Sequence, residues 1–98
     1  MVKWSDPAKL ALKEIHHYIA NDSKYYAKKV IREIVEKSEK LTDFSKIGRI
    51  VPELADSNIR ELFIYSYRLI YDISSADIQI LNIVHSKQIL EINDIDLQ

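Results

Sequence analysis

The sequence contains no cysteine, one glycine and two prolines among its 98 residues. Without cysteine the chain forms no disulfide, thiolate zinc site or iron–sulfur cluster, and it has no cysteine nucleophile. One glycine is too few for the glycine-rich loops that hold phosphates in P-loop and Rossmann proteins. No apolar run approaches the roughly 20 residues of a membrane-spanning helix, so we expect no membrane contact. The polar N-terminal residues predict no signal peptide, and we therefore expect a cytoplasmic protein.

The residues that are present predict one small globular domain over residues 1–98. Hydrophobic residues make up 47% of the chain and charged residues 30%, which is not the composition of a disordered chain. The net charge of −1 hides an asymmetry, because residues 1–46 carry +3 and residues 47–98 carry −4. The pI near 6.3 argues against a broad nucleic-acid-binding face but leaves room for a small basic pocket.

Two amphipathic helices are predicted in the first half of the chain. Apolar residues recur every three or four positions over 8–19, after Asp6 as the expected N-cap and Pro7 at the first helical position. Residues 21–23 break this pattern and supply caps for a second helix, whose apolar stripe covers residues 27–41. So short a break predicts an antiparallel helical hairpin, which needs another surface on which to bury its apolar stripes.

The second half of the chain changes to the period of two that is typical of strands. β-Branched and aromatic runs occupy residues 59–64, 67–73 and 78–85, and the gaps between them are short enough for hairpins. A further short strand is predicted at Trp4, whereas residues 43–58 are expected to be irregular. The predicted fold class is α+β, with an N-terminal helical hairpin packed on a small, mainly antiparallel β-sheet.

Six blocks of residues follow one another over nearly the whole chain. They are Trp4 with Ala8; Tyr18-Ile19-Ala20-x-Asp22-Ser23 with Tyr26-Ala27; Gly48-Arg49-x-Val51-Pro52-Glu53; Ile59-Arg60-Glu61-Leu62; Tyr67-Arg68-Leu69-Ile70-Tyr71; and Ile80-Leu81-x-Ile83-Val84-His85. Together they resemble the RelE/ParE superfamily of toxins from type II toxin–antitoxin (plasmid stabilisation) systems. The resemblance implies two N-terminal helices on a small sheet and a toxin held inactive by a cognate antitoxin protein. It also implies one of two targets, because ParE-like members poison DNA gyrase and RelE-like members cut mRNA on the ribosome without a metal.

The sequence favours the ParE-like branch, which acts by binding to DNA gyrase. The blocks around Pro52-Glu53 and Ile59–Leu62 are closer to ParE-like members, and Ser86-Lys87-Gln88 is less basic than the corresponding segment of many relatives. A protein that binds among ribosomal RNA phosphates gains much of its affinity from Lys and Arg. A RelE-like mRNA endoribonuclease is the alternative, and a non-toxic relative that acts only as a binding partner is the second. No cofactor or metal is implied, and a homodimer or a toxin–antitoxin hetero-oligomer fits either branch.

The catalytic candidates, which apply only to a ribonuclease, are His85, Arg68, Arg49 and Glu53. Metal-free RNA cleavage needs a base for the 2′-OH, cations over the phosphate and an acid for the leaving oxygen. The resemblance makes His85 the acid or base, and an ordinary imidazole pKa near 6.5 suits that role. The alternative for His85 is a polar residue at a strand end. Glu53 is either the general base or an ion-pair partner of Arg49 or Arg60.

The arginines have two interpretations each. Arg68 either binds a phosphate with its forked guanidinium or forms a cross-strand pair with Glu61 or Asp72. Arg49 lies in the predicted loop, where it contacts either a phosphate or a partner. Gly48 beside it is expected to supply a backbone angle that other residues avoid.

The binding candidates are Arg60, Tyr67 and Lys87. Arg60 is next to Glu61, which favours a structural ion pair for it. Lys87 follows His85 by two residues, so both point to the same side of the sheet if the strand continues. The tail over residues 89–97 alternates apolar and acidic residues, and its role is open between the core, an antitoxin contact and a disordered end.

Overall fold

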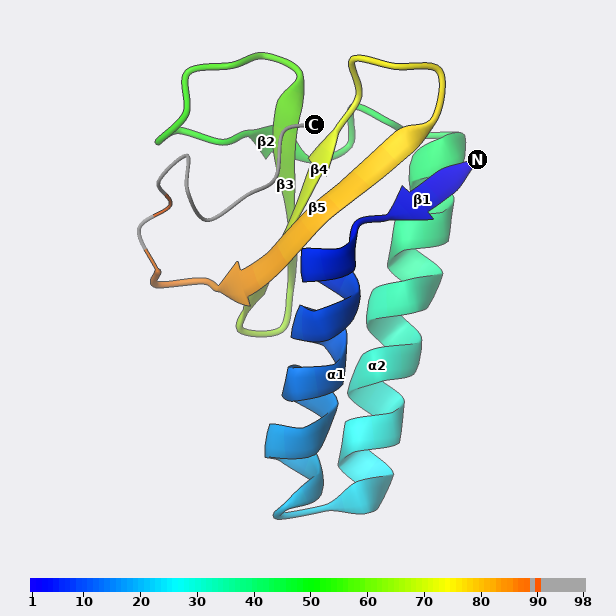
Figure 1. Ribbon diagram of the computed structural model, residues 1–98, viewed down its shortest axis with the longest axis vertical. Helices are drawn as coiled ribbons and strands as arrows, with labels where there is room; N and C mark the ends of the chain where they lie inside the picture. Colours follow the sequence, from blue (N-terminus) through cyan, green and yellow to red (C-terminus); the bar gives the residue numbers. More distant parts are fainter. Residues whose placement is uncertain (89, 91–98) are drawn as a thin grey trace.

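Two helices cover one face of a five-stranded sheet (Figure 1). The computed structural model describes residues 1–88 and residue 90. In chain order the elements are β1 (Val2–Trp4), α1 (Asp6–Ala20), α2 (Lys24–Glu39), a short 3₁₀ turn (Lys40–Thr42), β2 (Arg49–Ile50), β3 (Ile59–Ile64), β4 (Tyr67–Asp72) and β5 (Ile78–His85). The predicted α+β class and the helical hairpin are confirmed. The part of the tail beyond residue 90 lies outside the described residues.

The strands are arranged in the order β1-β5-β4-β3-β2. β1 runs parallel to β5, and the other neighbours are antiparallel, so the sheet is mainly antiparallel as predicted. The expectation that residues 43–58 are all irregular is wrong at β2, where Arg49 and Ile50 pair with Glu61 and Arg60. Two residues are too few to show a period of two, and this strand forms only because β3 offers it a partner.

Serine residues cap both helices. Ser5, and not Asp6, is the N-cap of α1: its hydroxyl accepts a hydrogen bond from the Ala8 N–H. The same hydroxyl donates to the Leu81 carbonyl at 2.8 Å, which attaches the start of α1 to β5. Asp6 is the first residue of the helix, so Pro7 is the second helical residue and not the first, although it still lies in the first turn. At α2 the cap is Ser23, whose hydroxyl accepts from the Tyr26 N–H.

The two sheet faces bury different sets of residues. β4 places Leu69 and Tyr71 against the helices, whereas Arg68 and Ile70 point to the opposite face, here called the outer face. The helix-facing core contains residues from both helices and from three strands: Ala8, Ile15, Val30, Ile34, Ile64, Leu69, Tyr71, Ile80 and Ile83. The outer face is also covered, because residues from β3 to β5 pack with residues from the connecting segments: Val51, Leu54, Ile59, Ile70, Leu81, Val84 and Leu90.

A β-bulge in β5 decides which face its last residues occupy. The partner of Ile70 is Asn82, whereas the partner of the next residue, Tyr71, is Ile80, which leaves Leu81 as an extra residue. Strict alternation from Ile80 would place His85 on the outer face. The bulge instead aligns His85 with Tyr67 on the side of the helices.

Gly48 is required for a close contact rather than for its backbone angle. It has no positive φ, so the expected unusual angle is wrong. A Cβ at this position would lie 2.5 Å from the Glu61 carbonyl oxygen and 2.6 Å from the Tyr71 hydroxyl. The Gly48 N–H donates to that hydroxyl at 2.9 Å, and the hydroxyl donates to the Ser45 carbonyl. Only glycine lets the chain approach the sheet this closely before β2.

No helix in the described part of the chain is both long and apolar enough to cross a membrane.

Candidate functional site

A network of two arginines and two glutamates lies on the outer face of the sheet. Arg68 is its centre, and its side chain is only 4% exposed. Its guanidinium donates to both carboxylate oxygens of Glu53, at 2.8 and 2.9 Å, and to Glu61 Oε1 at 2.6 Å. Arg49 pairs with the other oxygen of Glu61, and its guanidinium carbon lies 5.1 Å from the centre of the Phe63 ring. Arg49 is 61% exposed, whereas the burial of Arg68 and Glu61 is tolerated because both are paired and hydrogen-bonded.

The same network holds the chain that follows β5. Arg68 donates to the Gln88 carbonyl at 2.8 Å, and Glu53 accepts a hydrogen bond from the Leu90 N–H at 2.9 Å. The Leu90 side chain is buried in the outer-face core. Glu53 lies in the segment between β2 and β3, and Arg68 lies on β4. Together they connect the residues that follow β5 to the sheet.

The pairing keeps both groups charged. The hydrogen bonds from Arg68 lower the pKa of Glu53 from 4.5 to about 2, against the opposing effect of desolvation. The Glu53 and Glu61 carboxylates raise the pKa of Arg68 above its ordinary value. A carboxylate with so low a pKa is a weak proton acceptor near neutral pH. The guanidinium of Arg68 is bound by protein carboxylates, so of its two interpretations the structure contains the ion pair, with Glu61 as predicted and with Glu53 rather than Asp72. The expected partners of Glu53 were wrong, because its carboxylate pairs with Arg68 and not with Arg49 or Arg60.

His85 and Tyr67 lie on the other side of the sheet. They are cross-strand neighbours, and their ring centroids are 6.3 Å apart in an edge-to-face arrangement. His85 Nδ1 accepts a hydrogen bond from the Lys87 N–H at 3.2 Å, which leaves the proton of a neutral imidazole on Nε2. Tyr67 and Arg68 are consecutive residues of one strand and point to opposite faces. The sheet therefore separates His85 from Arg68, Glu53 and Arg49, and the four catalytic candidates do not form one cluster.

Lys87 and Arg60, the other basic candidates, are not among the residues that form the ion-pair network. β5 ends at His85, and Lys87 follows in a turn. The strand therefore does not continue to Lys87, which was the condition for Lys87 and His85 to point to the same side of the sheet. Arg60 is half-buried and donates to the Gly48 carbonyl at 3.1 Å. Its Nε atom is buried and has no partner among the described residues. Arg60 thus helps to fix the turn before β2.

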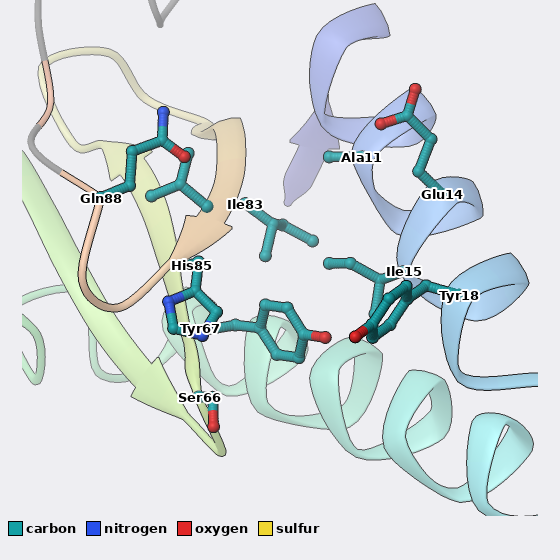
Figure 2. Close-up of a pocket in the computed structure, with 10 residues that line it drawn as sticks. Ala11, Glu14, Ile15, Tyr18, Ser66, Tyr67, Ile83, His85 and Gln88 are labelled. Atoms are coloured by element: carbon teal, nitrogen blue, oxygen red, sulfur yellow. The ribbon is translucent and has the colours of Figure 1, made fainter. Parts of the chain in front are cut away.

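A pocket of about 490 Å³ opens between α1 and the adjacent ends of β4 and β5 (Figure 2). The aromatic residues of its lining are Tyr18 from α1, Tyr67 from β4 and His85 from β5. Glu14 is the lining residue with a carboxylate, and Ala11, Ile15 and Ile83 add apolar surface. The sequence analysis singled out Tyr67 and His85 but missed Glu14 and Tyr18 as site residues. The available signal was helical spacing, since residues 14 and 18 are four apart and occupy one helix face.

A second aromatic pair extends this side of the molecule. The rings of Tyr26 and Tyr65 are 6.3 Å apart, and the Tyr65 hydroxyl donates to Glu33. Tyr65 has φ 54°, which is uncommon for a bulky residue. The hydrogen bond to Glu33 raises the pKa of Tyr65 to about 12, so its hydroxyl stays protonated.

Residues 1–88 and 90, which the structure describes, contain no candidate metal site. No group of three or more His, Asp or Glu side chains in this part of the chain is placed to hold a metal ion.

Comparisons with known proteins supply the family. A family model described as the ParE toxin of the type II toxin–antitoxin system parDE matches residues 2–90. The chain belongs to the ParE toxin family. A solved structure titled "Chromosomal ParDE TA system from P. aeruginosa" is similar to this ParE-family chain, with a TM-score of 0.72 and 25% sequence identity. The similarity covers 88% of this chain and 95% of that one. A search of curated proteins finds no match.

Family membership confirms the ParE-like interpretation of the sequence. It also supports a cognate antitoxin as a partner of this ParE-family chain, since the family is that of toxins from toxin–antitoxin pairs.

Proposed function

We propose that this ParE-family chain inhibits DNA gyrase by binding to it and that its cognate antitoxin relieves this inhibition. Family membership supports gyrase as the target, because ParE-like members of the superfamily poison that enzyme. The observation that carries the proposal is the engagement of Arg68 by Glu53 and Glu61. An arginine that is paired in this way is not available to neutralise the phosphate of an RNA substrate.

The separation of the remaining candidates also supports binding rather than RNA cleavage. A ribonuclease needs its base, its acid and its phosphate-binding cations around one phosphorus atom. His85 lies on the helix-facing side of the sheet and Arg68 on the outer face. The pI near 6.3 agrees with this, because tight binding among ribosomal RNA phosphates depends on basic side chains.

The proposal is tested by adding the purified chain to a bacterial DNA gyrase that supercoils relaxed plasmid. We expect supercoiling to fall in proportion to the chain added, whereas heat-unfolded chain at the same concentration has no effect. Addition of the cognate antitoxin in equimolar amount should restore supercoiling. Unchanged supercoiling at saturating folded chain would contradict the proposal.

A second measurement tests whether the chain has ribonuclease activity if the gyrase proposal fails. Primer extension on mRNA in a cell-free translation reaction detects breaks at codon positions. Breaks that disappear with His85→Ala would assign a RelE-like activity to the chain. Intact mRNA together with normal supercoiling would indicate a non-toxic relative that acts only as a binding partner.

A further inference from the structure

The pocket between α1, β4 and β5 is here called the aromatic pocket. It combines the rings of Tyr18, Tyr67 and His85 with the carboxylate of Glu14. Tyr18 is 74% exposed, and Figure 2 shows its hydroxyl facing that of Tyr67 across the pocket. Glu14 projects from α1 one turn before Tyr18 and takes part in no ion pair with any described residue. His85 lies edge-to-face against Tyr67 and closes the pocket at the end of β5.

The charge and the rings of the pocket both favour a cation. The face of an aromatic ring carries negative potential, and a cation over it is stabilised by about 0.5–1 kcal/mol at an exposed site. The Glu14 carboxylate adds a full negative charge, and no Lys or Arg is among the lining residues. Burial and the neighbouring tyrosines raise the pKa of Tyr67, so its hydroxyl remains protonated and adds no charge.

Among cations, a guanidinium matches this surface better than an ammonium. It is planar, so it stacks on a tyrosine or histidine ring, and its paired N–H groups fit both oxygens of a carboxylate. An ammonium is a compact, strongly hydrated charge without these two matches. Nucleic acid is disfavoured, because its phosphates would meet the Glu14 carboxylate and the lining contains no Lys or Arg to compensate.

We propose that this pocket binds an arginine side chain of a partner protein. The guanidinium stacks on the face of one of the lining rings and pairs with Glu14. The apolar lining from Ala11, Ile15 and Ile83 contacts the aliphatic part of the arginine and an apolar residue beside it. Such a buried arginine among aromatic rings is a typical hot spot of a protein interface. This assignment concerns partner recognition and does not depend on gyrase being the target.

The test is an NMR titration of the isotope-labelled full chain with N-acetyl-arginine amide. N-acetyl-citrulline amide is the matched control ligand, because it has nearly the same shape and no charge. We expect the signals of Tyr18, Tyr67 and His85 to shift saturably, with a dissociation constant for the arginine ligand at least fivefold smaller than for the citrulline ligand. N-acetyl-lysine amide should bind more weakly than the arginine ligand.

Two variants make the result specific to the pocket. Glu14→Gln should reduce the difference between the arginine and citrulline ligands to the part that the aromatic rings supply, whereas Glu36→Gln, at an exposed carboxylate on α2, should leave it unchanged. Equal binding of the two ligands, shifts confined to other parts of the chain, or an unaltered preference in Glu14→Gln would overturn the proposal. Stronger shifts of the pocket signals by uridine monophosphate than by the arginine ligand would also overturn it and indicate a nucleic acid.

Discussion

At the scale of single residues, the contacts of Gly48 explain why the only glycine of the chain lies before β2. Gly48→Ala would place a methyl group 2.5 Å from the Glu61 carbonyl oxygen and 2.6 Å from the Tyr71 hydroxyl, closer than van der Waals contact allows. We expect the free energy of unfolding to fall by about 1–3 kcal/mol, the usual effect of overpacking. Urea denaturation measures this change. Ser57→Ala, at an exposed loop position, is the control and should stay within about 0.5 kcal/mol of the wild type; equal stability of both variants would contradict the account.

The Glu53 carboxylate makes a second prediction at this scale. Its folded pKa of about 2 lies below the ordinary value of 4.5, so its pairing with Arg68 stabilises the fold fully above about pH 4.5. This contribution is lost as the pH falls through about 2 and Glu53 is protonated in the folded state. Glu53→Gln should therefore be less stable than the wild type at neutral pH, and the difference should shrink toward pH 2.

Urea unfolding of the two proteins at several pH values between about 7 and 2 measures that difference. Glu36→Gln provides a control carboxylate that is exposed and forms no ion pair with a described residue. A stability difference between wild type and Glu53→Gln that is the same at pH 7 and near pH 2 would show that the charge of Glu53 does not matter.

At the scale of elements, the two serine caps perform unequal tasks. Each accepts a hydrogen bond from a backbone N–H in the first turn of its helix, but only Ser5 also donates to β5. Ser23→Ala should lower the free energy of unfolding by about 1 kcal/mol through loss of the cap. Ser5→Ala should lower it further, because the Leu81 carbonyl loses its donor as well. Thermal unfolding compares the two variants, and an equal or smaller loss for Ser5→Ala would contradict the role assigned to that bond.

Some of the helices and strands could be predicted from the sequence, and others could not. Both helices and β3 to β5 were predictable, because each has enough residues to show its period of apolar positions. β2 was not, since two residues carry no period. The bulge at Leu81 was not predictable either, and it moves His85 to the face opposite Arg68. A reader of the sequence who assumes strict alternation would join these two residues in one site.

The candidate site was only partly predictable for a related reason. The pairing of Arg68 with Glu61 follows from two adjacent strands, and it was one of the alternatives that the sequence left open. The second carboxylate, Glu53, reaches Arg68 from an irregular segment whose path no local pattern predicts. The aromatic pocket lies between α1, β4 and β5. These elements are far apart in the sequence, so Glu14 and Tyr18 could not be assigned to the same site as Tyr67 and His85.

At the scale of the whole molecule, both faces of the sheet are covered by other parts of the chain. The helices bury one face, and Val51, Leu54 and Leu90 help to bury the outer face, where the Arg68 network holds Gln88 and Leu90. The helical hairpin projects beyond the sheet (Figure 1), and exposed tyrosines lie on it. The molecule thus presents exposed tyrosines to partners, and its Arg49 and Arg68 are in ion pairs with Glu61 and Glu53. Both features agree with the proposed action by binding.

The topology of a reporter plasmid in cells tests this account most directly. Gyrase introduces negative supercoils, so inhibition by the chain should relax the plasmid soon after expression is induced, before growth stops. Gel electrophoresis in chloroquine resolves the topoisomers, and cells with an early stop codon in the same gene are the control. The account predicts a shift toward relaxed topoisomers only with the intact gene. Growth arrest with an unchanged topoisomer distribution would contradict it.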